Sequence, residues 1–237
     1  PMINKDRLTN TFLDLVRLDS PSGQEKPVAD HLCALLRARG YDVHVDNAGT
    51  FFGGNSGNVI VRVPATGPGD AMAFSAHMDC VDPCIGVEPV LTDGVIRSAT
   101  STVLGGDDKA GIAEIMEALT RIHENPGWKH GPVKIAFTPD EEVGAGVKHF
   151  DVAGFGALVA YTMDGGKRGE IEDETFCADS AIVTFVGRDI HPGYAKDKMI
   201  PSVKVAGDFV AGLPREGAPE TTEGKQGYIH PISIKGN

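Results

Sequence analysis

Histidine and acidic side chains follow a series of short apolar runs in this 237-residue sequence. Each run is typical of a buried strand, and the groups after it can bind a metal ion or move a proton. In chain order they are Ser-Ala-His-Met-Asp at 75–79, Gly-Gly-Asp-Asp at 105–108, Asp-Glu-Glu at 140–142, and Asp164. Open α/β sheets bind ligands outside the carboxyl ends of their strands. The pattern therefore predicts a metal site at one edge of a sheet.

The first group pairs an imidazole with a carboxylate two residues later. Residues i and i+2 of a strand point to the same side, so His77 and Asp79 should face one way. His77 could bind a metal through one ring nitrogen while Asp79 accepts the N–H of the other. A histidine satisfied at a strand end, beside a surface aspartate, is the alternative. The H-x-D spacing alone does not separate the two.

Two glycines precede two acids in the second group. The glycines allow a sharp turn, and Asp107 or Asp108 stands where the N-cap of the following amphipathic helix belongs. An N-cap accounts for one acid, whereas two acids beside two glycines also suit a carboxylate that bridges two metal ions.

The third group is a run of three consecutive acids, which repel one another unless a cation or a proton lies nearby. Glu141 and Glu142 can therefore take different tasks, one binding metal and the other carrying a proton from water to the departing amine. A solvated acidic loop is the alternative for this stretch alone. Imidazole and carboxylates without thiolates suit zinc, and also cobalt or manganese.

The elements that must position these groups alternate between helix and strand. Helical periodicity appears at 8–16, at 28–36 and after Gly106. Strands are expected at 41–45, 58–63, 71–74, 133–138 and 158–163. This alternation predicts an α/β fold with a mostly parallel sheet between helices on both faces.

The pattern changes after Gly166. Strands are predicted at 181–186 and 228–235, with a helix at 201–213 between them. We interpret residues 178–237 as the start of a smaller α+β domain, and residues 1–177 as the N-terminal part of the catalytic domain.

Bulk composition narrows the function classes. The formal charge of −11 argues against nucleic acid or an anionic membrane as a partner. No run approaches the roughly 18 apolar residues that a membrane span needs. The four cysteines form no C-x-x-C pair, so a reduced, cytoplasmic setting is expected.

Four motifs taken together resemble the co-catalytic zinc exopeptidase family, and within it the tripeptide aminopeptidase branch called peptidase T. They are 75–79, 104–110, 137–144 and 161–166, and they occur in the family's order. The resemblance extends from the first predicted helix to the last residue. It implies a hydrolase with two zinc ions per full-length subunit and a lid domain inserted in the catalytic domain.

The resemblance also implies the metal ligands. His77 and Asp164 would bind one zinc, Asp107 would bridge the two, and Glu142 would bind the second. The Asp107–Asp108 peptide is expected to be cis.

Three further residues would serve the reaction. Glu141 would be the general base for the water that bridges the metals, and Asp79 would orient His77. His191 resembles the lid histidine that approaches the substrate or its developing oxyanion, although it could instead only shape the turn before Pro192.

One departure from the family concerns the end of the chain. The family has a further zinc-ligand histidine late in its sequence, and this sequence is expected to end inside the lid, which would be incomplete. The predicted function is a di-zinc aminopeptidase that acts on tripeptides or short peptides and forms a homodimer through the lid. A related deacylase or dipeptidase, or a non-catalytic fragment, are the alternatives.

Overall fold

The computed structural model describes residues 3–236, and contacts divide the chain into two compact units, residues 1–172 and 173–237. The boundary predicted after residue 177 falls just inside the second unit. The assignment of the two parts as catalytic domain and lid stays a prediction.

The first unit is built on a five-stranded sheet in the order β1-β2-β6-β3-β7. Its strands are β1 (Asp42–Val45), β2 (Val59–Val63), β3 (Met72–His77), β6 (Val133–Thr138) and β7 (Val159–Thr162). Strand β3 runs parallel to both β6 and β7, whereas β1–β2 and β2–β6 are antiparallel. The α/β class is confirmed, and the sheet is mixed rather than mostly parallel. The segment that joins β1 to β2, residues 46–58, contains a short 3-10 turn and no crossover helix, and the two strands pair antiparallel.

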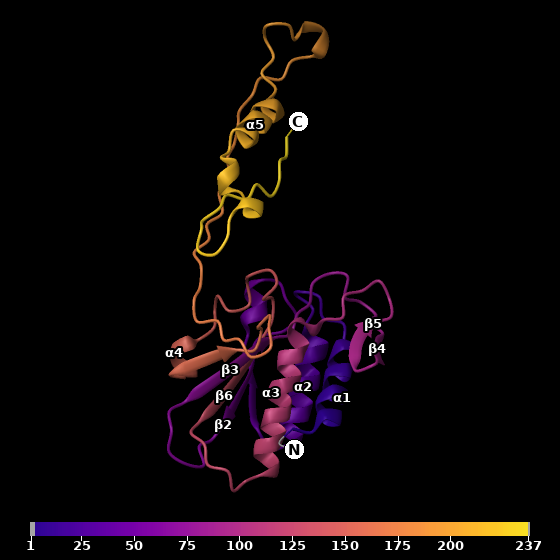
Figure 1. Ribbon diagram of the computed structural model, residues 1–237, viewed down its shortest axis with the longest axis vertical. Helices are drawn as coiled ribbons and strands as arrows, with labels where there is room; N and C mark the ends of the chain where they lie inside the picture. The colour runs from indigo at the N-terminus through magenta and orange to yellow at the C-terminus, as the bar shows by residue number, and fades with distance from the viewer. Residues whose placement is uncertain (1–2, 237) are drawn as a thin grey trace. The chain divides into compact units, whose positions relative to one another are not determined.

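Three helices pack on one face of this sheet: α1 (Lys5–Val16), α2 (Lys26–Ala38) and α3 (Gly106–Glu124). Figure 1 shows them side by side along the strands. Alternate residues of β2 enter the core, so Val59 and Val61 are buried against Ile135 and Phe137 of β6. The long helices of residues 3–172 thus cover one face instead of the expected two, and α4 (Val152–Phe155) is a single turn.

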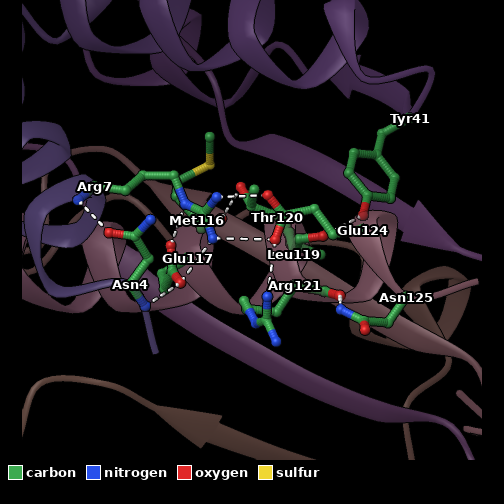
Figure 2. A network of polar contacts seen from close by, with 10 residues as sticks. All are labelled: Asn4, Arg7, Tyr41, Met116, Glu117, Leu119, Thr120, Arg121, Glu124 and Asn125. Carbon is green, nitrogen blue, oxygen red and sulfur yellow. Dashed lines mark hydrogen bonds and ion pairs between the residues drawn. The ribbon is translucent and has the colours of Figure 1, made fainter. Parts of the chain in front are cut away.

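A polar network fastens α1 to α3 (Figure 2). The guanidinium of Arg7 donates from Nε to Glu117 Oε2 over 2.6 Å and from Nη2 to Glu117 Oε1 over 2.9 Å. Its Nη1 donates to Glu124, and the backbone N–H of Asn4 adds a bond to Glu117. Because the Glu117 side chain is only 2% exposed, the bonds to Glu117 are partly shielded from water, whereas the bond to Glu124 is exposed. They fasten the middle and the end of α3, beyond its first turn, to α1.

A hairpin that the sequence interpretation missed lies between the first and second motifs. Strands β4 (Pro89–Thr92) and β5 (Val95–Ser98) pair antiparallel. Asp93 and Gly94 between them have φ values of 51° and 77°. Two positive φ values are the mark of a type I′ turn, and Asp-Gly between alternating residues is a strong hairpin signal.

The second unit contains α5 (Ser202–Ala211), which confirms the helix expected at 201–213. The strands predicted at 181–186 and 228–235 are wrong, because neither segment forms a ladder. Ile182, Val186 and Ile232 are 95%, 92% and 85% exposed. A strand needs a partner for its backbone groups and a covered face for its apolar side chains, and these residues have neither within the described part of the unit.

Short 3-10 turns complete the chain. They are η1 (Ala48–Phe51), η2 (Pro192–Tyr194), η3 (Arg215–Gly217) and η4 (Pro219–Thr221). Among the helices of residues 3–236, none combines the length and the apolar character needed to cross a bilayer.

Candidate metal centre

Parallel pairing brings three of the predicted groups to the same edge of the sheet. His77, the last residue of β3, is in register with Thr138, the last residue of β6. The acids at 140–142 therefore emerge beside Asp79. Strand β7 ends at Thr162, opposite Ser75 of β3, and delivers Asp164 on the other side of β3.

The His77 ring is buried, and its two nitrogens have different surroundings. Nε2 lies 2.8 Å from Asp107 Oδ1, and 3.9 Å from both Glu141 Oε2 and Asp164 Oδ2. Nδ1 faces Asp79, 3.1 Å from its backbone oxygen and 3.3 Å from Oδ1. Nε2 is thus the nitrogen turned toward the acids, and Nδ1 is the one that Asp79 orients.

Asp79 does more than orient the imidazole. Its fully buried carboxylate accepts bonds from the backbone N–H groups of Glu141 (3.0 Å) and Glu142 (3.1 Å) and from Ser22 Oγ (2.7 Å). Burial would raise the pKa of Asp79, but the hydrogen bonds from His77, Ser22 and Glu141 outweigh it and hold the pKa below its usual range. Asp79 therefore stays ionised and sets the backbone of the glutamate pair.

The two acids at the start of α3 divide their tasks. The Asp107–Asp108 peptide is cis, as the resemblance implied, and both residues have non-helical backbone angles. The side chain of Asp107 is 69% exposed and points to His77. Asp108 is buried and accepts from the N–H groups of His77 and Gly111, both over 3.2 Å. Burial, and then the charge of Asp164, raise the pKa of Asp108 to about 7.

Two sets of ligand atoms lie within 4.8 Å of one another: those of His77, Asp107 and Glu142, and those of His77, Asp108 and Asp164. Asp108 was not among the predicted ligands. Its oxygens already accept two backbone bonds, whereas the carboxylates of Asp107, Glu142 and Asp164 accept none from the backbone of the described residues.

The charges of the site fit a divalent cation. Burial lowers the pKa of His77, but hydrogen bonds with Asp79 and Asp107 outweigh it and raise the pKa to about 10. Burial, and next the charge of Asp107, raise the pKa of Asp164 to about 6. The acids thus repel one another and favour positive charge at Nε2, which a metal ion satisfies. One imidazole with carboxylate oxygens is a ligand set that suits zinc, cobalt or manganese.

His191, the remaining predicted residue, belongs to the second unit. It is the N-cap of η2, and its Nδ1 accepts from the N–H of Gly193 over 3.1 Å. This bond shows that His191 shapes the turn around Pro192. Its contact with a substrate stays a prediction.

Comparison with known proteins gives the class. Residues 73–173 match Peptidase family M20/M25/M40. A protein named Peptidase T from Listeria welshimeri is 37% identical over 98% of this chain. The match covers 66% of that relative, so the chain spans about two thirds of the length of the curated proteins that it resembles.

Comparison with solved structures gives the same class of protein. The aminopeptidase PepT from Bacillus cereus superposes with a TM-score of 0.75 at 32% identity, over 90% of this chain and 58% of that one. A tripeptidase from Staphylococcus aureus gives 0.77 at 29% identity, over 94% and 59%. The chain belongs to Peptidase family M20/M25/M40. Within that family, its similarity is to the proteins named Peptidase T.

Proposed function

We propose that the protein to which this chain belongs is a metal-dependent aminopeptidase, which removes the N-terminal residue from tripeptides or short peptides with two zinc ions. The observation that carries the proposal is the convergence of His77 with Asp107, Glu142 and Asp164, which come from three separate segments. The similarity to proteins named Peptidase T supports the substrate class.

The chain's own residues would divide the work of hydrolysis. Bound divalent ions would polarise the scissile carbonyl and lower the pKa of a water molecule. His77, Asp107, Glu142 and Asp164 would hold those ions. The negative site would also attract the free α-ammonium group that marks a peptide's N-terminus.

Glu141 would move the proton. Its backbone is fixed by the bond to Asp79, while its side chain is 52% exposed and Oε2 lies 3.9 Å from His77 Nε2. A fixed backbone with a free carboxylate at the edge of the ligand cluster suits a general base, which takes a proton from water and gives it to the departing amine.

The proposal is tested with Glu141→Gln, because the amide keeps the size of the side chain but cannot accept the proton. We expect turnover of a tripeptide such as Ala-Ala-Ala to be lost while the zinc content, measured by elemental analysis, stays at the wild-type level. Glu170→Gln, at a surface acid that pairs with Lys167, is the matched control. Full turnover in Glu141→Gln would contradict the role of Glu141.

Substrate panels separate the other functions. Cleavage of dipeptides or N-acyl amino acids in preference to tripeptides would indicate the dipeptidase or deacylase alternative. Zinc content near zero together with no turnover would indicate the non-catalytic fragment. A cytoplasmic setting, and a homodimer formed through residues 178–237, remain predictions, and sedimentation of the full chain tests the second.

A further inference from the structure

The connection between α1 and α2, residues 18–25, touches the segments that form the metal centre. Lys109 Nζ, two residues after Asp107, donates to the carbonyl of Leu18 over 3.0 Å. The N–H of Cys80 donates to the carbonyl of Ser20 over 3.0 Å. The main-chain oxygens of the connection therefore hold the start of α3 and the segment after β3.

Ser22 adds a side-chain contact to the same region. Its hydroxyl donates to Asp79 Oδ2 over 2.7 Å, and that oxygen also accepts from the N–H of Glu142. With the N–H groups of Glu141 and Glu142, the Ser22 hydroxyl is a third donor that holds the Asp79 carboxylate in one orientation. Because Asp79 also faces His77 Nδ1, the orientation that Ser22 sets passes to the imidazole as well as to the glutamate pair.

Glu25 holds the loop that carries the glutamate pair. Its carboxylate is fully buried, and Oε1 accepts from the N–H of Gly23 (2.9 Å) and of Asp140 (3.1 Å). Asp140 has a φ of +54°, a left-handed conformation that few side chains tolerate. The chain turns there directly before Glu141. The bond to Glu25 thus fixes the residue at which the direction of the loop is set.

The other oxygen of Glu25 makes no such contact. Glu25 Oε2 and Asp140 Oδ2 are both buried without a hydrogen-bond partner among the described residues. A buried carboxylate with one oxygen unpaired is costly. A glutamine at position 25 would keep the accepting oxygen and replace the unpaired one with an N–H₂ donor. The acceptor role of residue 25 can therefore be separated from its charge.

We propose that residues 18–25 are a positioning element of the metal centre, with Ser22 and Glu25 as its positioning residues. Ser22 orients Asp79, and Glu25 fixes the turn at Asp140. Neither residue binds the metal. Together they set where His77, Glu141 and Glu142 stand before a metal or a peptide arrives. The inference rests on the proposed metal function, because the groups that it positions are the ligands and the base assigned there.

The test is Co²⁺ binding to the full chain, followed by the visible absorption of the bound ion, which reports the geometry of its ligands. Residues that orient metal ligands typically change affinity by 10–100-fold when mutated. We expect Ser22→Ala and Glu25→Ala each to weaken Co²⁺ affinity by about tenfold and to alter the spectrum. Ser22→Thr, which keeps the hydroxyl, and Glu25→Gln should restore both.

Glu117→Gln is the control, because it disturbs a buried carboxylate of the α1–α3 network without contact to residues 18–25. It should lower stability and leave the Co²⁺ affinity and spectrum unchanged. Wild-type binding by both alanine variants would overturn the inference, and so would an equal loss in Glu117→Gln. If the wild-type chain itself binds no Co²⁺, the proposed function is wrong. Far-UV circular dichroism confirms that each variant is folded.

Discussion

The substitution Asp79→Asn isolates the buried carboxylate at the centre of the site. Asp79 accepts from Glu141 N and faces His77 Nδ1 with one oxygen, and accepts from Ser22 Oγ and Glu142 N with the other. Asparagine offers one accepting oxygen and one N–H₂ group. Its oxygen should take the first position, because an N–H₂ group there would face both the N–H of Glu141 and His77 Nδ1, whereas at the second position the Ser22 hydroxyl can rotate.

The loss of stability in Asp79→Asn depends on which groups the asparagine N–H₂ then faces. The Ser22 hydroxyl can rotate and accept from the N–H₂ group, but the N–H of Glu142 cannot and loses its partner. An unpaired buried donor costs about 1–3 kcal/mol, and the remaining bonds lose their ionic character, which adds about 1 kcal/mol. We therefore expect Asp79→Asn to lower the free energy of unfolding of the metal-free chain by about 2–4 kcal/mol. This is a large part of the roughly 5–15 kcal/mol typical of native proteins.

Guanidinium denaturation in excess chelator measures this loss without any contribution from metal binding. A loss of that size lowers the midpoint by roughly 0.5–1.5 M. Asp30→Asn is the matched control, because Asp30 forms only an exposed pair with Lys26 and should change little. If Asp79→Asn and Asp30→Asn unfold at the same denaturant concentration, the hydrogen bonds to Asp79 do not hold the loop, and the reasoning fails.

Three further perturbations test other parts of the structure. Glu117→Gln should cost about 1.5–3 kcal/mol at neutral pH by denaturant unfolding. Hydrogen bonds from Arg7 hold the pKa of Glu117 below its ordinary 4.5. The stability that Glu117 adds to the fold is therefore fully present above pH 4.5 and is lost as the pH falls further. If the loss of stability in Glu117→Gln did not depend on pH, the ion pair with Arg7 would be contradicted. Gly111→Ala places a Cβ against Asp108 Oδ1 and 2.5 Å from the Met163 carbonyl oxygen, so the variant should bind Zn²⁺ more weakly in calorimetry. Gly106→Ala is the control, because a Cβ at that position meets no atom within 4 Å and Zn²⁺ binding should not change. Added Zn²⁺ at 100 times its Kd should stabilise the chain by about 2.7 kcal/mol in thermal melts, and no shift would argue against a native metal site.

The parts of the site that lie at strand ends could be predicted from sequence. Apolar runs of strand length indicate β3, β6 and β7. The polar groups directly after these runs can be recognised as a site, because the ends of parallel strands meet at one edge of the sheet. Residue type and spacing alone did not separate the tasks of Asp107 and Asp108, although the family resemblance implied Asp107 as the ligand. Both follow the same glycines, and only the fold shows that one faces His77 Nε2 while the other caps backbone N–H groups.

Residues that act from a distance along the chain carried no sequence signal. Ser22 lies 57 positions before Asp79, in a loop whose Ser, Pro and Gly are typical of any turn. Glu25 reads as a polar residue at the start of α2, yet it is fully buried. The strands expected at 181–186 and 228–235 failed for a related reason. Their β-branched and apolar residues suit a strand, but pairing depends on a partner that the local sequence does not reveal.

The acids of the site fall into two classes, and the classes explain how so many like charges share one edge. Asp79 and Asp108 are buried, and backbone N–H groups satisfy their oxygens. Asp107 and Glu141 are mostly exposed and have no backbone donors among the described residues. Backbone N–H groups thus hold the first pair in place, and the second pair is left free to bind cations or carry protons. Hydrolytic chemistry needs both, since a ligand is useful only where its position is already set.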